Sequence, residues 1–174
     1  MKRTLFSIAA ILCASLVFVS CSKNDDTPYV DAQALTTVFE VHNSDWKATT
    51  DESGNDCFLI TYDETEITSE ITDKGAVWIY YSFDDGITYE LAPSLAQMDK
   101  NGNMFDFTAS SGTDDKGGLV TLKALKYTGN TTQAPNFSPN LVVKVVSIPS
   151  SLYNAHKNVN KEDYNEVKRV FKLQ

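Results

Sequence analysis

Short apolar segments with a period of two recur from residue 36 onward, and this period is typical of β-strands. Clusters of Asp, Asn, Gly, Ser and Pro separate the segments, as expected of turns. The expected strands are 36–41, 46–49, 57–62, 76–83, 87–91, 104–108, 119–127 and 141–148, with 67–71 as a weaker, Thr-rich edge strand. Their spacing predicts a mainly β chain that folds as one antiparallel β-sandwich over residues 36–174.

The segments between the strands have the composition of turns. Asp84-Asp85-Gly86 and Asn101-Gly102 predict tight hairpins, because Gly and Asn tolerate a positive φ. Residues 51–56 predict a further turn, residues 110–118 a loop, and residues 129–139 a long polar connection.

The period changes near the C-terminus. Tyr164, Val167 and Phe171 would lie on one face of a helix, and Asn160 is placed to cap its N-terminus. This predicts one short amphipathic helix near 160–172, which would lie across the sandwich or its open end.

Residues 1–20 have the parts of a bacterial export signal. Lys2 and Arg3 precede an apolar segment from Leu5 to Val19, and a polar stretch follows. The apolar segment is shorter than the roughly 20 residues of a comfortable membrane span. We therefore expect a signal peptide rather than a membrane-spanning or core helix.

The end of this signal, Phe18-Val19-Ser20-Cys21, resembles the lipobox of bacterial lipoproteins, with Phe at the position of the usual Leu. The resemblance implies cleavage before Cys21, whose thiol would carry a diacylglycerol and anchor the protein in a membrane. Residues 21–35 would then form a polar tether. Ordinary secretion, with cleavage near Ser15 or Ser20, is the alternative.

The tether has a signature of its own. Lys23 followed by Asp25-Asp26 resembles the surface-export signal of Bacteroidota lipoproteins, although Asn24 separates the lysine from the acids. The resemblance implies an outer-membrane lipoprotein exposed at the cell surface. An anchor that faces the periplasm, with a merely solvated tether, is the alternative.

Loss of the signal removes Lys2 and Arg3 and changes the formal net charge from −8 to −10. So acidic a protein is not expected to bind nucleic acid or an anionic lipid surface, because both favour Lys and Arg. With Cys21 lipidated, Cys57 would be left without a disulfide partner. Its apolar surroundings predict a buried, inert thiol, with a nucleophilic thiol as the alternative.

The arrangement as a whole resembles a group of small, uncharacterised Bacteroidota surface lipoproteins. The shared features are the lipobox, the Val38-Phe39-Glu40-Val41 strand with Trp46 shortly after it, the 75–80 strand, and the ending from Lys144 to Lys168. The resemblance implies a β-sandwich with a C-terminal helix. It implies no activity, and it assigns no functional residues.

Signatures of catalysis or of cofactor binding are absent from the sequence, which has no nucleophile elbow, zinc-protease motif, phosphate loop or Cys-x-x-Cys. His42 and His156 are the two histidines, and each is expected to be a surface residue rather than a base or ligand. Asp99-Lys100-Asn101-Gly102-Asn103 is expected to be a hairpin rather than a calcium loop, because it lacks the Gly and the bidentate acid that such a loop requires. No cofactor and no metal are expected.

The aromatic residues are the remaining candidates for function. Segment 76–83 is apolar on both faces, so either it is covered on both sides or Trp78 and Tyr80 form an exposed platform. Trp46 lies between polar neighbours and is expected to be the more exposed tryptophan. These three aromatics are the candidate binding residues of a non-catalytic module for a glycan, a peptide or a partner protein. The alternatives are an accessory subunit of an envelope assembly and, third, a hydrolase with carboxylates brought together from loops.

Overall fold

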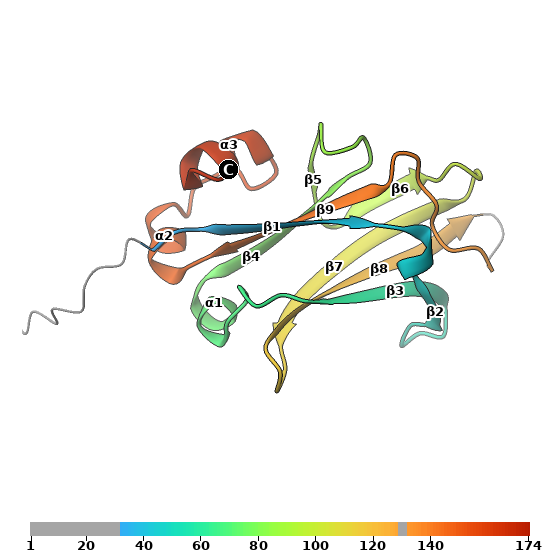
Figure 1. Cartoon of the computed structure of the whole chain (residues 1–174), viewed down its shortest axis with the longest axis horizontal. Coiled ribbons are helices and arrows are strands. Elements are labelled where there is room, and N and C mark those ends of the chain that lie inside the picture. The colour runs from blue at the N-terminus through green and yellow to red at the C-terminus, as the bar shows by residue number, and fades with distance from the viewer. Residues whose placement is uncertain (1–31, 129–131) are drawn as a thin grey trace, which may run out of the picture. The chain divides into compact units, whose positions relative to one another are not determined.

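Two antiparallel sheets make up most of the computed structural model, which describes residues 32–128 and 132–174 (Figure 1). Within these residues the strands are β1 (Leu35–Val41), β2 (Lys47–Thr50), β3 (Asp56–Asp63), β4 (Ala76–Ser82), β5 (Glu90–Leu91), β6 (Ser94–Met98), β7 (Met104–Thr113), β8 (Gly118–Thr128) and β9 (Leu141–Ile148). Sheet A has the order β1-β9-β4-β5, and sheet B the order β2-β3-β8-β7-β6. The predicted mainly β fold, with two antiparallel sheets and a short C-terminal helix, is confirmed.

The main core lies between the two sheets. Alternate residues of each strand point inward, so Phe58 and Leu122 of sheet B face Tyr81 and Val143 of sheet A. Phe107 is central to this core, because its ring lies 5.6 Å from Tyr81 and 5.9 Å from Trp46 between ring centroids.

A second apolar layer covers the outer face of sheet A. The helical elements are η1 (Asn43–Asp45), α1 (Ser69–Lys74), α2 (Ser150–Ala155) and α3 (Tyr164–Phe171). Figure 1 shows α3 on the side of sheet A that faces away from sheet B. Val167 and Phe171 of α3 pack there in one buried cluster with Tyr80, Val146 and Ile148.

The C-terminal helix begins later than its sequence suggests. Asp163, not Asn160, is the N-cap, and its carboxylate accepts bonds from the backbone N–H groups of Asn165 (3.0 Å) and Glu166 (3.2 Å). Asn160 instead accepts a bond from the N–H of Glu162 at 3.1 Å, in the turn before the helix. The amphipathic face predicted for this helix is confirmed, because Tyr164, Val167 and Phe171 are its buried residues.

The weak edge strand predicted at 67–71 is wrong, because most of this segment belongs to α1. Thr68 caps the helix by accepting a bond from the N–H of Ile71 at 3.3 Å, so its hydroxyl favours a helix start over a strand. Ile67, the apolar residue of the segment, is buried just before the cap.

The strand predicted at 87–91 is reduced to the two residues of β5. The carboxylate of Asp84 accepts bonds from the hydroxyl of Ser82 and from the hydroxyl and N–H of Thr88, so the chain stays in a turn up to that point. These bonds, above all the one from the Thr88 hydroxyl, lower the pKa of Asp84 to about 2.

The loop predicted at 110–118 is also largely wrong. β7 continues to Thr113 and β8 begins at Gly118, so the connection is a tight turn in which Asp114 accepts bonds from Lys116 N–H and Gly117 N–H. The ladder tolerates the small polar residues of 110–113 because they lie at the end of a long hairpin. Strand β6 and helix α2 were not predicted.

The predicted signal peptide, the predicted lipidation site Cys21 and most of the predicted tether lie outside the described residues. The described residues all belong to one compact unit of the chain. Across the described part, no helix is both long enough and apolar enough to span a membrane.

Candidate binding site at Trp78

Trp46 lies in the core, and the expectation that it is the more exposed of the two tryptophans is wrong. Its side chain is 8% exposed and packs against Phe107. The cause is the 3-10 turn η1, which carries the chain from sheet A to sheet B and directs Trp46 between them while Lys47 stays in solvent. The side chain of Asn43 fixes this turn by donating to the carbonyls of Ala134 and Pro135 at 3.1 and 3.0 Å.

Tyr80 is also buried and cannot offer a free aromatic face. Its ring meets the ring of Tyr164 edge-on at 5.0 Å, and its hydroxyl donates to the backbone carbonyl of Lys161 at 2.8 Å. Burial raises the pKa of this hydroxyl well above its usual value. Tyr80 therefore positions the segment before α3, instead of contacting a ligand itself.

Trp78 is the one candidate of the three that retains an accessible surface. It is half-buried on the outer face of β4, where the ring of Phe171 meets it edge-on at 5.7 Å. The C-terminal helix thus covers one side of the indole and leaves the rest accessible. The two alternatives for this strand face were an exposed aromatic platform and a covered face. The face is fully covered at Tyr80 and partly covered at Trp78.

Two hollows meet at Trp78, and we call them together the Trp78 groove. The first has a volume of about 280 Å³ and reaches from β4 toward β7, and the second has a volume of about 430 Å³ and reaches toward α2. Trp78 and Lys161 line both. The other lining residues are Val77, Ile79, Leu91, Ala92, Ala109, Ser110 and Ser111 in the first, and Tyr153, Lys157, Val159, Asn160 and Glu162 in the second.

The short strand β5 keeps the first hollow open. It pairs only with Tyr80 and Tyr81 of β4, so the edge of β4 from Val77 to Ile79 has no neighbouring strand in sheet A. One bond, from Ala92 N–H to the Ile79 carbonyl at 2.8 Å, closes the end of this edge. Unpaired strand edges offer backbone donors and acceptors to a ligand.

The charges of the groove are mainly positive. Apart from Tyr153, the ionisable residues that line the groove are Lys157, Lys161 and Glu162, and all three are exposed. Among the described residues, one pair of opposite charges has its nitrogen and oxygen within 4 Å, and this is Lys123–Asp51 on sheet B. Neither groove lysine therefore has a carboxylate within that distance. In a chain with a net negative charge, this favours an anionic ligand locally.

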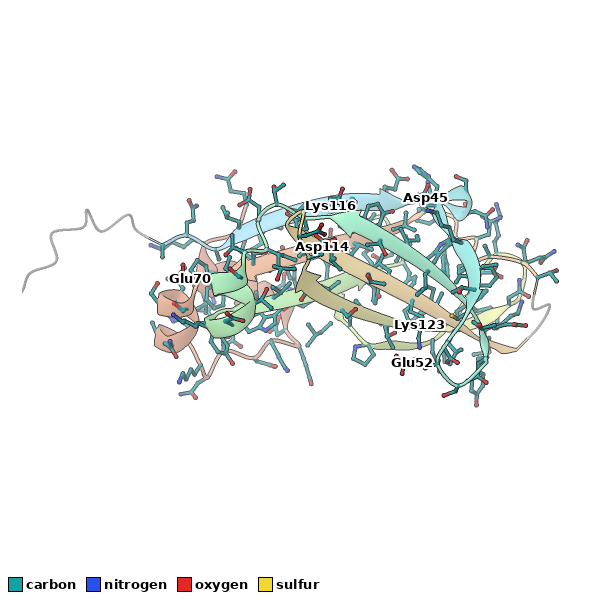
Figure 2. The ribbon with its side chains drawn as sticks, turned by 90° about the horizontal axis from the view of Figure 1, so that it is seen from below. Asp45, Glu52, Glu70, Asp114, Lys116 and Lys123 are labelled. Carbon is teal, nitrogen blue, oxygen red and sulfur yellow. The ribbon has the colours of Figure 1, made fainter. Side chains whose placement is uncertain are left out.

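A separate hollow, of about 490 Å³, lies on the outer face of sheet B, which no helix of the described residues crosses (Figure 2). Cys57, Leu59 and Lys123 line it together with residues 50–53. Lys123 and Glu52 are labelled on this side in Figure 2. No aromatic side chain lines this hollow, and Lys123 is already paired with Asp51 at 3.8 Å, so it is the weaker candidate.

Asp99, in the segment that was compared with a calcium loop, has a structural role. The buried carboxylate of Asp99 accepts bonds from Asn101, Asn103 and Asn136, which fix the hairpin between β6 and β7. This confirms a hairpin at the position compared with a calcium loop. Among residues 32–128 and 132–174, no three His, Cys, Asp or Glu side chains are grouped to hold a metal ion.

The histidines lie at opposite edges of the described structure and share no partner. His42 is exposed, and its Nδ1 lies 3.0 Å from the side-chain amide of Asn140. His156 is half-buried and meets Phe171 edge-on at 5.5 Å. The predicted surface position is confirmed for His42, whereas His156 belongs partly to the apolar layer under α3.

Sequence reasoning missed the lysines of the groove. Lys157 and Lys161 stand in an irregular segment between α2 and α3, where a period of neither two nor 3.6 relates them to Trp78. Their local excess of positive charge in an acidic chain was the one signal available.

Comparison of the chain with protein-family models, with curated proteins and with solved structures finds no match.

Proposed function

We propose that this protein is a non-catalytic binding module that takes a glycan with acidic groups in the Trp78 groove. The observation that carries the proposal is that the half-buried Trp78 and the exposed Lys161 each line both hollows of the groove. An indole offers a large, rigid apolar face at low entropic cost, and sugar rings present a matching apolar face. The unpaired ammonium groups of Lys157 and Lys161 would bind carboxylate or sulfate groups.

The size of the groove agrees with a short saccharide. Ligand pockets usually have volumes of about 300–1,000 Å³, and the two hollows of about 280 and 430 Å³ would each take one or two sugar units. The hydroxyls of Ser110 and Ser111 and the side chain of Asn160 add neutral donors and acceptors at the two ends.

The chain has two tryptophans, which makes the test direct. In a Trp46→Phe variant the fluorescence reports Trp78 alone, and titration with acidic saccharides should shift or quench it. Lys161→Ala should weaken this binding by about tenfold, the value of one charge-assisted contact. Lys116→Ala, an equal charge change at the β7–β8 turn (Figure 2), should leave binding unchanged. Binding that survives Lys161→Ala and Trp78→Phe together, measured by calorimetry because this variant lacks the Trp78 signal, would refute the site.

The proposed location is the outer membrane, with a lipid on Cys21 and the domain facing the cell exterior. Support comes from the lipobox-like Phe18-Val19-Ser20-Cys21 and the acidic tether that follows. Cys21→Ala should abolish labelling by a fatty-acid analogue and release the protein from membranes, whereas Cys57→Ala should do neither. Labelling that persists in Cys21→Ala would refute the anchor.

An accessory subunit of an envelope assembly is the second candidate function. One observation favours it: the outer edge of β1 pairs with no other strand in the described part of the chain. Co-purification of stoichiometric envelope proteins with the chain, together with no response to any saccharide, would favour this function over glycan binding.

A further inference from the structure

The four sheet edges differ in how they are protected against pairing with another strand. β2 has four residues, β5 has two, and β6 is interrupted by a register shift between Ser94 and Gln97. Short, bulged edges resist pairing. β1 is different, because it pairs with β9 over all seven residues without a shift and leaves its other edge free among the described residues.

The side chains of β1 also lack the usual protection. Glu40 is its one charged residue, and the strand has no lysine, proline or glycine. Leu35 is 41% exposed and Val38 is 52% exposed, and they are two of the five large apolar side chains found exposed in the described residues. A long, regular and apolar edge is a template for an additional strand.

The sequence of β1 is complementary to itself in antiparallel register. With Val38 opposite its own copy, Leu35 lies opposite Val41, Thr36 opposite Glu40, and Thr37 opposite Phe39 of the second copy. Apolar residues then meet apolar residues at the centre and at both ends, and no like charges face each other.

This register also keeps each side chain on its own face. Residues 35, 37, 39 and 41 share one face of β1, and residues 36, 38 and 40 share the other, so every pair joins residues of one face. A two-fold axis through Val38, perpendicular to sheet A, would therefore join two sheets into one continuous sheet of eight strands. Such a contact is isologous and closed, as in most homodimers.

We infer that the edge of β1 is a dimerisation surface whose partner is β1 of a second copy of this chain. Seven paired residues form a small contact, at the low end for specific interfaces of about 1,200 Å². The dimer should therefore be weak and reversible in dilute solution.

Cysteine cross-linking in the full-length chain tests the register. Directly paired residues have Cα atoms about 4.5–5.5 Å apart, within disulfide range. Val38→Cys should thus give a disulfide-linked dimer on copper-catalysed oxidation. Glu40→Cys on the same edge should not, because its two copies would lie about 13 Å apart along the ladder. Ile87→Cys, at an 81% exposed site away from the edge, controls for random collision, and the unmodified chain controls for its natural cysteines.

We expect at least a fivefold excess of dimer for Val38→Cys over both control variants. Equal cross-linking at Val38, Glu40 and Ile87, or none at Val38 above the unmodified chain, would overturn the inference. A Val38→Cys adduct with a different protein would assign the edge to a foreign strand and would also overturn it.

A second variant removes dependence on the cysteine chemistry. Val38→Lys places two like charges opposite each other on the two-fold axis, and the exposed position should leave the monomer folded. Sedimentation of the full-length chain in detergent should show a concentration-dependent dimer that Val38→Lys abolishes and Ile87→Lys retains. A chain that stays monomeric at all concentrations, or a dimer that survives Val38→Lys, would contradict the inference. Neither result bears on ligand binding at Trp78, which lies on β4.

Discussion

The two sheets bury their inner faces against each other but differ on their outer faces. The outer face of sheet A carries Tyr80, Val146 and Ile148, all fully shielded beneath α3 and the C-terminal residues. The outer face of sheet B carries Thr61 and Thr121, whose hydroxyls lie 3.3 Å apart, in a surface that no helix of residues 32–128 or 132–174 crosses (Figure 2).

This difference decides where a ligand can bind. A face that is wholly covered offers nothing to a partner, and an open face of threonines offers little apolar area. Trp78 lies at the border, where the cover of sheet A ends and β5 is too short to close the edge of β4. The candidate site therefore exists because α3 covers one part of the Trp78 indole and leaves the other part accessible.

The largest expected effect comes from removing the cover. Deletion of residues 160–174 exposes the partners of Tyr164, Val167, Phe171 and Leu173, each of which is buried. Burial of a large apolar side chain contributes about 1.5–3 kcal/mol, and a domain has about 5–15 kcal/mol in total. We expect the truncated chain to unfold at 25 °C, measured by circular dichroism and dye binding. A melting temperature equal to that of the full chain would show that the helix is an independent arm.

The covered face was predictable because its signal is periodic. Residues 141–148 are apolar on both faces, and Tyr164, Val167 and Phe171 supply the matching stripe on a helix. Segment 67–71 and the loop at 110–118 were predicted wrongly because side-chain caps and hairpin pairing decided them, and neither changes the hydrophobic period.

The candidate site was predictable only in part. Trp78 was named because a large aromatic residue stands on a strand face, but burial of Trp46 depends on a turn fixed by Asn43 to a segment about 90 residues away. Lys157 and Lys161 reach the groove through the fold of an irregular segment. Such long-range placement leaves no trace in a local pattern.

High pH should act on the covered side and, less, on the main core. Burial raises the pKa of Tyr164 to about 12 and raises that of Tyr80 and Tyr89, all in the apolar layer that α3 forms with sheet A. In the main core, burial raises the pKa of Tyr62 to about 12 and also raises that of Tyr81. Between pH 10 and 12 the unfolded chain loses these protons while the folded chain keeps them, so the free energy of unfolding must fall as pH rises.

Absorbance at 295 nm and circular dichroism should therefore change together above pH 10, because these tyrosines would ionise upon unfolding. Lys144, whose pKa is lowered from 10.5 by burial and then by Lys168, acts in the opposite direction, but its contribution is complete by about pH 10.5 and does not offset the loss at higher pH. Ionisation of all eight tyrosines with intact circular dichroism would contradict the burial of these side chains.

Two lysines give a matched test of the two faces. Lys144 on the covered face is 9% exposed, and its Nζ lies 4.0 Å from the ring centre of Tyr89 and 4.5 Å from that of Tyr164. Lys123 on the open face has only the 3.8 Å pair with Asp51. We expect Lys144→Ala to cost about 1–3 kcal/mol through lost packing and cation–π contacts. Lys123→Ala should cost less than about 0.5 kcal/mol.

Chemical denaturation of both variants measures the difference. Lys144→Met keeps an apolar chain of similar length without the charge, so it separates packing from the cation–π term. If Lys144→Met is as stable as the unmodified chain, lost packing accounts for the loss of stability in Lys144→Ala. Equal costs for Lys144→Ala and Lys123→Ala would remove the distinction between the faces.

The smallest effect concerns Cys57, a buried residue on the otherwise open face of sheet B. Its thiol is 1% exposed, and burial raises its pKa. We expect a thiol reagent to modify it slowly in the folded protein and at least a hundredfold faster in denaturant.

Asp51 holds the adjoining turn by accepting bonds from the N–H groups of Ser53 and Asn55, both at 2.9 Å. Asp51→Ala should therefore accelerate the labelling of Cys57 in the native state by about tenfold with little loss of stability. Glu52→Ala in the same turn should not, because the hydrogen bonds of this turn within the described part of the chain use the carboxylate of Asp51 and not that of Glu52. Rapid labelling of the unmodified native protein would show that this face is open down to its strands, and it would restore a reactive role for the thiol.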